Sequence, residues 1–380
     1  MKKVAFLTGT RADYGKLKPL IRPLLKDPNF EIHILVTGMH LLEKYGATVN
    51  HVMEDRLGIV HLLPNQHPNQ TMESALSRTI EQISEVCTGN DFDLIVVHGD
   101  RIEALAGAIV GVLRNLPVAH IEGGEVSGTV DGLIRHAVSK LSHLHFVSNE
   151  IAQKRLLQLG ENLNSIYVIG SPDIDVMLFN ELPNLNEVKN RYKIHFDDYG
   201  ILIFHPVTNE IERLDESVVA VSEAIQDSRK NFVVIKPNND LGTEIVQAAL
   251  VKLSDPTRFI HLPSMRFEFF LQLLKSADFI VGNSSAGVRE AAYFGVPAIN
   301  IGSRQRNRHT NKLILNVDYK KSEILTAIES SFKLERIPSQ AFGDGKSGEK
   351  FARILAQSEF WPVVTDKQFV DVIDLFGGEK

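Results

Sequence analysis

The amino-acid sequence predicts an α/β protein made of two Rossmann-like domains, each built on a parallel sheet. Short apolar runs alternate with longer amphipathic runs along most of the chain, a pattern typical of βαβ units. The apolar runs are continuous, as expected for strands that helices cover on both faces. The alternation stops once and then starts again, and 380 residues are enough for two domains of ordinary size.

Five apolar runs in the first half of the chain are expected to be strands. They lie at residues 4–7, 32–36, 94–97, 118–121 and 144–147. The stretches between them carry the periodicity of amphipathic helices. The clearest predicted helices lie at residues 16–25, 72–86, 102–113 and 151–159. Because crossover helices separate the strands, the strands should run parallel.

A break at Gly170-Ser171-Pro172, followed by polar sequence up to residue 199, predicts a linker. Residues 1–170 would then form the N-terminal domain and residues 171–355 the C-terminal domain. The second series has expected strands at 201–204, 232–235, 279–281 and 298–301, and expected helices at 214–226, 269–275 and 286–293. The tail is expected to be helical at 349–357 and 367–375, and residues 356–380 could pack back on the N-terminal domain.

Composition argues against several classes of protein. The net charge of −6 provides no basic footprint for general binding to nucleic acid or to a membrane surface. The single cysteine, Cys87, cannot form an intramolecular disulfide, and no Cys/His spacing suggests a zinc site. No apolar run approaches the roughly 18 residues of a membrane span. The apolar run near the start is too short for a signal peptide, so the expected location is the cytoplasm.

Polar and glycine residues gather directly after the predicted strands in both halves. In an open parallel sheet, ligands bind beyond the carboxyl ends of the strands. This placement is the main reason to predict an enzyme.

Two loops of the first half could bind or transform a ligand. Residues 8–16 form a turn of small residues before a predicted helix, where backbone N–H groups, Arg11 and Lys16 could hold an anion. Residues 97–101 place Asp100 at the end of a strand, where it could act as an acid or a base. An ordinary turn and a helix N-cap are the alternatives for the two loops.

Carboxylates accumulate in the loops that follow neighbouring strands. Asp100, Glu122, Glu125 and Asp131 lie within 32 residues. Clustered carboxylates shift one another's pKa values, so that one can be an acid while another is a base. Metal ligation is an alternative, but it would need a diphosphate-bound magnesium ion, which the nearby arginines make unnecessary. Glu125 or Asp131 could also simply cap the helix that begins near Gly132.

The second half carries the pattern of a nucleotide site. A strand ends in the small polar turn of Gly282, Ser284 and Ser285, which opens a predicted helix and could hold a diphosphate. Glu290 lies farther along that helix and could accept hydrogen bonds from a ribose. Arg304 begins a group of three arginines within residues 304–308, for which an anion pocket and a solvated basic loop are the two interpretations.

Two further turns of the second half follow strands. His205 could donate a hydrogen bond to a phosphate, although a lone histidine is more often structural. The turn at residues 236–240 contains Asn238 and is rich in hydrogen-bonding groups, with a plain Pro-Asn turn as the alternative.

Together these segments resemble the UDP-N-acetylglucosamine 2-epimerase family, and more narrowly its hydrolysing branch, which supplies N-acetylmannosamine for sialic acid synthesis. The similar segments are GTRADYGKL at 9–17, VTGMHL at 36–41, HGDRIEALAGA at 98–108, HIEGGEVSGTVDGLIRHAVSKLSH at 120–143, GSPDID at 170–175, HPVTNE at 205–210 and GNSSAGVREAAYFGVPAINIGSRQRNR at 282–308. RADYG and HIEGGE mark the hydrolysing branch, since the other branch carries a Pro-Glu pair in place of Ala12-Asp13.

The resemblance implies a glycosyltransferase B type of fold, in which two Rossmann-like domains face a central cleft and the C-terminal half holds most of the UDP. It implies no nicotinamide cofactor, no metal requirement, and a homodimer or homotetramer. Carried over by position, the catalytic residues are Asp100, Glu122 and Asp131. By the same carry-over, Arg11, His205, Ser284, Ser285 and Arg304 hold the diphosphate, Glu290 holds the ribose, and Asn238, Met265, Arg266 and Phe267 lie near the uridine. Lys16 and Gly282 join the predicted UDP-sugar site because of their place in the turns that follow strands.

The reaction implied is the hydrolysis of UDP-N-acetylglucosamine to UDP and N-acetylmannosamine, through anti elimination of UDP and hydration of 2-acetamidoglucal. The base at C2 stays open between Asp100 and Asp131, with Glu122 assisting water or the C1 cation. One alternative is the same chemistry on a UDP-2,4-diacetamido sugar of the legionaminic acid route. The others are a UDP-sugar glycosyltransferase, the reversible epimerase and a non-catalytic sugar-nucleotide sensor.

Overall fold

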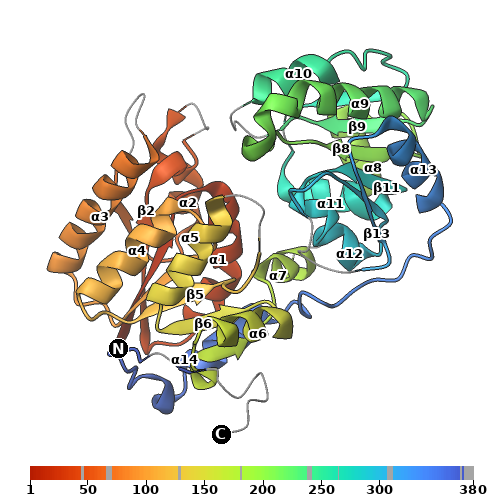
Figure 1. The fold of residues 1–380 in the computed structure, drawn as a ribbon. Coiled ribbons are helices and arrows are strands. Elements are labelled where there is room, and N and C mark those ends of the chain that lie inside the picture. Colours follow the sequence, from red (N-terminus) through yellow and green to blue (C-terminus); the bar gives the residue numbers. More distant parts are fainter. Residues whose placement is uncertain are drawn as a thin grey trace, which may run out of the picture. The chain divides into compact units, whose positions relative to one another are not determined.

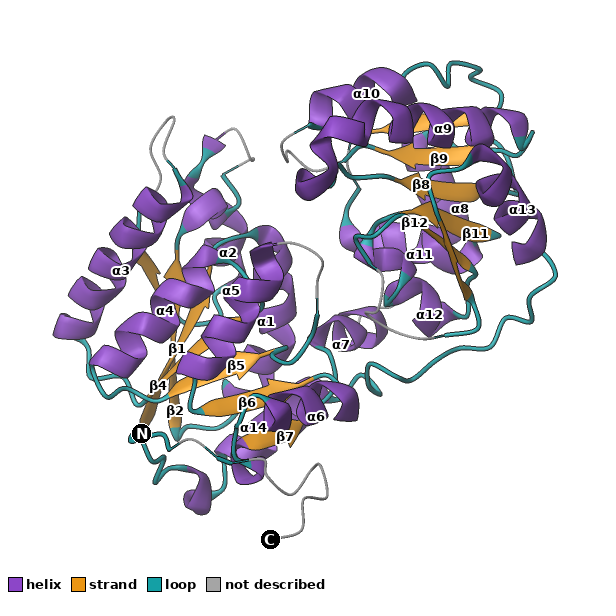
Figure 2. Cartoon of the chain, viewed as in Figure 1, coloured by secondary structure: helices purple, strands orange, loops and turns teal. Residues whose placement is uncertain are grey.

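The computed structural model describes residues 1–43, 47–65, 71–126, 130–179, 182–237, 242–263, 265–305, 311–368 and 370–371. The chain forms two compact units, each an α/β layer structure with one parallel sheet (Figures 1 and 2), which confirms the predicted fold class of two α/β domains. Unit 1 comprises Met1–Glu125, Val130–Phe179 and Gly343–Lys380, and unit 2 comprises Val126–Thr129 and Asn180–Phe342.

The sheet of unit 1 has the strand order β3-β2-β1-β4-β5-β6-β7, and neighbouring strands are parallel. The strands are β1 (Lys2–Thr8), β2 (Phe30–Val36), β3 (Ile59–Leu62), β4 (Leu94–His98), β5 (Val118–Ile121), β6 (Leu144–Val147) and β7 (Ile166–Val168). The order reverses between β1 and β4, and in open parallel sheets ligands bind beyond the carboxyl ends of the strands at such a reversal. The residues predicted to be catalytic follow β4 and β5, next to this point.

Helices cover both faces of this sheet. Successive side chains of each strand point to opposite faces, so a continuous apolar strand presents apolar side chains that must be buried on both. One apolar core contains Val4 and Phe6 of β1 and the helices α1 (Arg11–Leu24), α2 (Val49–Asp55) and α14 (Ser347–Leu355). The other contains Ala5 and Leu7 and the helices α3 (Met72–Gly89), α4 (Ile102–Leu113) and α5 (Val130–Leu141). Two shorter helices, α6 (Glu150–Gln158) and α7 (Pro172–Phe179), complete the unit.

Unit 2 repeats the plan with a sheet of order β10-β9-β8-β11-β12-β13. The strands are β8 (Gly200–Ile203), β9 (Phe232–Ile235), β10 (Phe259–Leu262), β11 (Phe279–Gly282), β12 (Ala298–Ile301) and β13 (Ile314–Val317). One face packs against α9 (Leu214–Asp227), α10 (Thr243–Leu250) and α13 (Lys321–Ser331), and the other carries α8 (Leu185–Tyr192), α11 (Phe267–Ser276) and α12 (Glu290–Phe294) (Figure 1).

The boundary between the units lies nine residues beyond the predicted one at 170/171, and α14 belongs to unit 1 although residues 171–355 were assigned to the second domain. The physical reason is a contact between α7 and α14. Both oxygens of the buried Asp175 carboxylate accept backbone N–H groups at the start of α14, from Ser347 (2.9 Å) and Gly348 (2.8 Å). Part of the predicted linker is also regular structure, since residues 185–192 form α8.

The described part of the tail corrects another prediction. Helix α14 corresponds to the expected helix at 349–357, but Lys367, Gln368, Val370 and Asp371 of the expected helix at 367–375 lie outside any helix. Residues 361–368 alternate between half-buried and exposed side chains, as an extended segment lying on a surface does. The described part of the tail after α14 is therefore an extended segment on unit 1 and not a second helix.

Candidate functional site

The loop between β1 and α1 is organised by a carboxylate. Asp13 accepts hydrogen bonds from the backbone N–H of Thr10 (2.9 Å) and of Gly9 (3.0 Å) and from the Thr8 hydroxyl (2.6 Å), and the Thr10 side chain completes a capping box. Helix α1 therefore starts at Arg11, five residues before the predicted start. Arg11 itself is exposed at the start of this helix.

Lys16, which is predicted to lie at the diphosphate, forms ion pairs with two carboxylates of unit 1. Its Nζ atom lies 3.2 Å from Oε2 of Glu122 and 2.9 Å from Oδ2 of Asp173. The ammonium group therefore orients Glu122 in this structure.

Glu122 is the most constrained of the predicted catalytic residues. Its side chain is buried and accepts a hydrogen bond from the Ser171 hydroxyl at 2.5 Å, while His98 Nε2 lies 3.1 Å from its other oxygen. Its backbone φ is 60°, in the left-handed region that non-glycine residues rarely occupy. Such conformations cost about 1–3 kcal/mol and persist where the surroundings hold them, typically at functional sites.

Arg135 of α5 connects Glu122 to Asp100. Its guanidinium forms an ion pair with the Asp100 carboxylate and donates to the backbone oxygen of Glu122 at 2.8 Å. Asp131 lies on the first turn of the same helix, one turn before Arg135. The fold thus connects the loops after β4 and β5 through one buried arginine, which holds the Asp100 carboxylate and the Glu122 backbone, on the helix whose first turn bears Asp131.

Behind this cluster lies a fully buried histidine. Nε2 of His120 is 2.8 Å from the carbonyl oxygen of Gly99, so this nitrogen carries the proton, and Nδ1 accepts from the Ser139 hydroxyl at 3.0 Å. Burial lowers the pKa of His120 to about 3, against an opposing effect of the Gly99 carbonyl. His120 is therefore neutral near pH 7 and anchors the loop that carries Asp100.

Glu125, the fourth clustered carboxylate, is also buried. Among the residues that the structure describes, its Oε1 atom has no hydrogen-bond partner. Residues 127–129, which follow in the sequence, lie outside the described part of the chain.

In unit 2, Asn283 organises the loops after β8, β11 and β12. Its buried side chain accepts from the backbone N–H of His205 (2.7 Å) and donates to the backbone oxygen of the same residue (2.8 Å). Its own carbonyl accepts from Arg304 (3.0 Å) and Gln305 (3.2 Å). Asn283 therefore brings His205 and Arg304 to one place.

His205 is buried beside Arg304. Burial lowers its pKa to about 3, and the charge of Arg304 acts in the same direction. The imidazole is neutral near pH 7 and has one N–H to donate, which suits a hydrogen bond to a phosphate oxygen. Glu210, at the end of the HPVTNE segment, accepts from the hydroxyl groups of Ser303 and Tyr319 and so fixes the loop before Arg304.

The turn after β11 begins where its backbone passes close to the backbone of the neighbouring strand β8. Gly282 has a φ of 132°, and a Cβ atom there would overlap the carbonyl oxygen of Ile203 on the neighbouring strand. The predicted single helix at 286–293 is instead a short 3-10 turn, Ser285–Gly287, capped by Ser284, and then α12. Ser285 is half-buried on that turn, and Glu290 is buried on the first turn of α12.

The residues predicted near the uridine lie at the start of α11 or outside the described residues. Arg266 is the exposed N-cap of α11, and Met265 and Phe267 beside it are half-buried. Asn238 lies outside the part of the chain that the structure describes.

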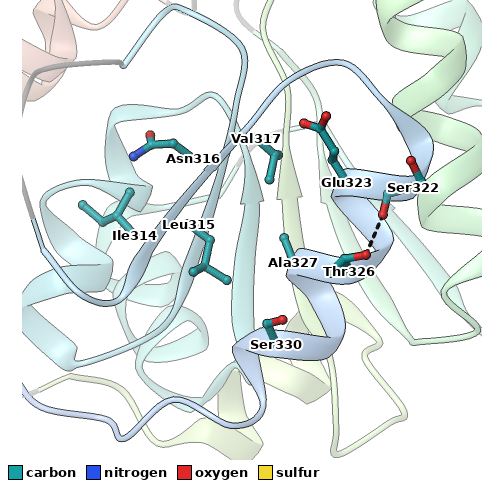
Figure 3. Close-up of a pocket in the computed structure, with 9 residues that line it drawn as sticks. All are labelled: Ile314, Leu315, Asn316, Val317, Ser322, Glu323, Thr326, Ala327 and Ser330. Atoms are coloured by element: carbon teal, nitrogen blue, oxygen red, sulfur yellow. Dashed lines mark hydrogen bonds between the residues drawn. The ribbon is translucent and has the colours of Figure 1, made fainter.

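An open groove of unit 2 lies apart from these residues (Figure 3). It runs between β13 and α13, and none of the predicted site residues lines it. A smaller hollow under the turn after β11 includes Gly282 and Ser284 in its walls. Of these two hollows, only the smaller one therefore includes predicted site residues.

Sequence reasoning missed the residues that hold the site together. Arg135, Ser171 and Asn283 all lie inside the quoted motifs, but nothing in the local pattern showed which side chain they would contact. Among the described residues, no cluster of three or more histidine, cysteine or acidic side chains is placed to hold a metal ion. Over the same residues, no helix is long and apolar enough to cross a membrane.

Comparison with known proteins adds the following. A family model described as UDP-N-acetylglucosamine 2-epimerase matches residues 22–356. A UDP-N-acetylglucosamine 2-epimerase of Neisseria meningitidis serogroup B is 46% identical over 98% of this chain and 100% of that protein. A hydrolysing UDP-N,N'-diacetylbacillosamine 2-epimerase of Legionella pneumophila is 33% identical over 93% of this chain and 96% of its own length. The polysialic acid biosynthesis protein P7 of Escherichia coli is 32% identical over 87% of this chain and 86% of that protein.

Solved structures show the same fold. The UDP-GlcNAc 2-epimerase of Methanocaldococcus jannaschii, in complex with UDP-GlcNAc and UDP, superimposes with a TM-score of 0.77 at 25% identity and covers 93% of this chain and 99% of its own. The Neisseria meningitidis UDP-GlcNAc 2-epimerase structure bound to UDP-GlcNAc has a TM-score of 0.80 at 18% identity, with the same coverage.

Proposed function

The chain belongs to the UDP-N-acetylglucosamine 2-epimerase family, and from this premise we propose that it hydrolyses UDP-N-acetylglucosamine to UDP and N-acetylmannosamine. The family confirms the resemblance stated from the motifs and the prediction of an enzyme. One observation carries the proposal on the structural side, namely that Arg135 of unit 1 holds the Asp100 carboxylate and the backbone oxygen of Glu122 together, on the helix whose first turn bears Asp131. A relative named for polysialic acid biosynthesis supports a role in supplying sialic acid synthesis.

The first step is an elimination. A carboxylate takes the proton from C2, the C1–O bond breaks, and its electron pair leaves with the UDP oxygen while a C1–C2 double bond forms. Coupling the two bond cleavages avoids a free carbanion at C2. Asp100 and Asp131 are the candidate bases, since neither is buried as deeply as Glu122.

The second step hydrates the 2-acetamidoglucal. The oxygen of a water molecule bonds to C1 and its proton passes to a carboxylate, while C2 receives a proton on the face opposite to the one that lost it. Glu122 is proposed to orient this water or stabilise positive charge at C1. Its orientation by Lys16 and Ser171 supports this role, since a fixed carboxylate needs no rearrangement in the transition state.

Unit 2 is proposed to hold UDP. The neutral imidazole of His205, the guanidinium of Arg304 and the hydroxyls of Ser284 and Ser285 offer hydrogen-bond donors to the diphosphate, with Glu290 facing the ribose. Charge-assisted donors at the leaving oxygen favour departure of UDP. Arg11 of unit 1 is proposed to assist at the same diphosphate.

The same chemistry on a UDP-2,4-diacetamido sugar is the second candidate. It is favoured by the hydrolysing relatives of Legionella pneumophila and Campylobacter jejuni, which are 33% and 32% identical and are named for diacetylbacillosamine. We place UDP-N-acetylglucosamine first because the Neisseria meningitidis relative is 46% identical. A homodimer or homotetramer and a cytoplasmic location complete the proposal.

One NMR time course in D2O with each sugar nucleotide tests the proposal. The expected result is free N-acetylmannosamine with deuterium at C2 and stoichiometric UDP. A nucleotide-linked epimer would point to the reversible reaction instead, and hydrogen retained at C2 would exclude solvent exchange. Asp100→Asn should abolish UDP release while UDP binds within a few-fold of wild type. Turnover by this variant at a near wild-type rate would remove Asp100 from the catalytic set.

A further inference from the structure

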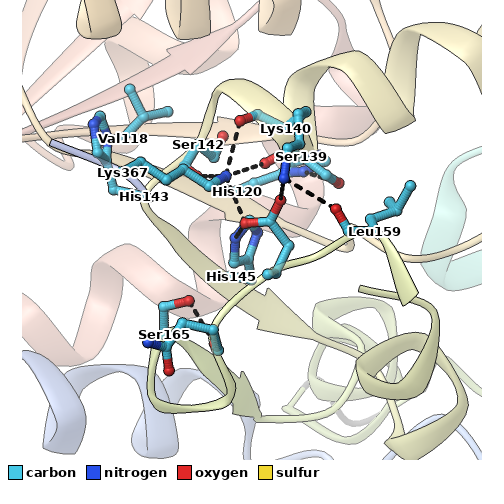
Figure 4. A network of polar contacts seen from close by, with 12 residues as sticks. Val118, His120, Ser139, Lys140, Ser142, His143, His145, Leu159, Ser165 and Lys367 are labelled. Atoms are coloured by element: carbon cyan, nitrogen blue, oxygen red, sulfur yellow. Dashed lines mark hydrogen bonds and ion pairs between the residues drawn. The ribbon is translucent and has the colours of Figure 1, made fainter. Parts of the chain in front are cut away.

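A lysine of the tail reaches into a buried polar cluster of unit 1 (Figure 4). The Nζ atom of Lys367 donates to the backbone oxygens of Ser142 (2.6 Å), Lys140 (2.8 Å) and Ser139 (3.2 Å). The same atom forms an ion pair with Oε2 of Glu161 at 2.5 Å. One ammonium group from the end of the chain therefore meets four acceptors around the end of α5.

These acceptors include the last carbonyl groups of a helix. The final turn of an α-helix has no intrahelical donors for its carbonyl oxygens, and it carries the negative end of the helix dipole. Helix α5 ends at Leu141, so the oxygens of Ser139 and Lys140 belong to this turn. Lys367 thus caps α5 from a position 225 residues beyond Ser142.

Glu161 keeps the lysine in place. It is completely buried, and its oxygens also lie 3.0 Å from Nε2 of His145 and 3.1 Å from Nζ of Lys140. Burial alone would raise the pKa of this carboxyl, but the hydrogen bonds and charges of His145 and Lys367 lower it to about 2. Removing one partner from a buried carboxylate destabilises the folded protein, because part of its charge is left without a partner. The ion pair with Glu161 therefore fixes the position of Lys367.

Helix α5 is also the element that positions the catalytic cluster. Asp131 lies on its first turn, and its Arg135 holds the Asp100 carboxylate and the Glu122 carbonyl. Ser139, near the capped end, donates to His120, which in turn anchors the carbonyl of Gly99 immediately before Asp100. Two routes therefore lead from the capped end of α5 to the proposed carboxylates.

From this arrangement we infer that Lys367 is a positioning residue for the reaction. It fixes the C-terminal end of α5, and through α5 it fixes Asp131, Asp100 and the backbone of Glu122. This inference rests on the proposed function for its catalytic consequence. Its structural consequence, the ordering of α5, can be measured without any substrate.

The test replaces Lys367 by methionine, which keeps the aliphatic stem and removes the charge. We expect kcat to fall about tenfold or more, since a small displacement of a catalytic group can cost up to about a hundredfold. KM and the Kd for UDP should change less than about threefold, because unit 2 is proposed to hold the nucleotide. Amide hydrogen exchange should become faster in α5 and stay unchanged in unit 2.

Lys350→Met is the matched control. Lys350 is a half-exposed lysine of α14 with a single ion pair to Asp344 at 3.0 Å, and its loss should leave kcat and α5 exchange at wild-type values. A Lys367→Met enzyme with kcat within twofold of wild type would overturn the inference, as would unchanged exchange in α5. A wild-type protein that turns over neither sugar nucleotide would refute the proposed function. The hydrogen-exchange measurement would still test whether Lys367 orders α5.

Ser139→Ala keeps the test decisive if Lys367→Met does not fold. It removes only the hydroxyl that holds His120 and leaves the backbone oxygen for Lys367. We expect kcat to fall several-fold with KM unchanged. A wild-type kcat in this variant would refute the coupling between the capped end of α5 and the Asp100 loop.

Discussion

Ser171→Ala removes one atom from the proposed active site and leaves the rest of the cluster in place. The Ser171 hydroxyl donates to Oε1 of Glu122 at 2.5 Å, and the serine is 1% exposed. Alanine fits the same space, so the change deletes a hydrogen bond without creating a large cavity. Lys16 and His98 still contact the other carboxylate oxygen, so Glu122 loses orientation and keeps its burial.

The size of the effect follows from the kind of hydrogen bond. A hydrogen bond to a charged group contributes about 1.5–3 kcal/mol. If all of it is lost in the transition state, kcat falls roughly 10- to 150-fold, at about 1.4 kcal/mol for each factor of ten. Because the serine orients Glu122 and not the nucleotide, KM and UDP affinity should stay within about threefold.

The assay is the release of UDP under saturating substrate, together with urea unfolding of the same preparation. Ser331→Ala is the control, since Ser331 is a buried serine of unit 2 whose hydroxyl donates to the backbone oxygen of Ile328 at 2.7 Å, and it lies in no proposed site. Ser331→Ala should lose about 1 kcal/mol of unfolding free energy and Ser171→Ala about 1.5–3 kcal/mol, and only Ser171→Ala should lose kcat. A kcat within twofold of wild type for Ser171→Ala would refute the role given to Glu122.

Two further predictions concern the two units separately. Gly282→Ala should destabilise unit 2 by at least about 3 kcal/mol and abolish UDP binding, because its Cβ atom overlaps the Ile203 carbonyl at a φ of 132°. Gly89→Ala is the control, because an added Cβ atom there has no atom within 4 Å, and it should change the free energy of unfolding by less than about 1 kcal/mol. Equal urea midpoints for the two variants would contradict the overlap expected at Gly282. His120 should stay neutral with its proton on Nε2 down to about pH 4, because its pKa is lowered to about 3 in the folded protein. As pH falls below about 6.5, only the unfolded state takes up a proton at His120. The contribution of His120 should therefore lower the free energy of unfolding as pH decreases. A ¹⁵N NMR midpoint near 6.5 for this ring would show that the histidine is solvated.

The sequence located the central strands because these are buried on both faces and read as continuous apolar runs. The four strands that it missed, β3, β7, β10 and β13, are the four edges of the two sheets. Edge strands have one partner and more exposed side chains, as β3 shows with no buried residue, so their apolar signal is weak. These strands were therefore missed because their place at a sheet edge weakens the apolar pattern, and not because their residues have a low β propensity.

The candidate site shows a similar division. Asp100, Glu122 and the serine turn could be found because they follow strands, and position after a strand is a local property of the sequence. Their partners could not, since Ser171 lies 49 residues from Glu122 and Arg135 lies 35 residues from Asp100. Lys16 was assigned to an anion site from its charge and its place in the first turn, and nothing in the sequence indicated that its ammonium group pairs with two carboxylates of the same unit.

The path of the chain through the two units has a consequence for biosynthesis. Unit 2 is almost wholly one continuous stretch, Asn180–Phe342, and can start to fold as soon as that stretch leaves the ribosome. Unit 1 needs Phe351 and Leu355 of α14 to fill its core, so the core cannot close until α14 has been synthesised. The nascent N-terminal half therefore exposes the surface of α1 that α14 will cover, and this is where a chaperone would be needed most.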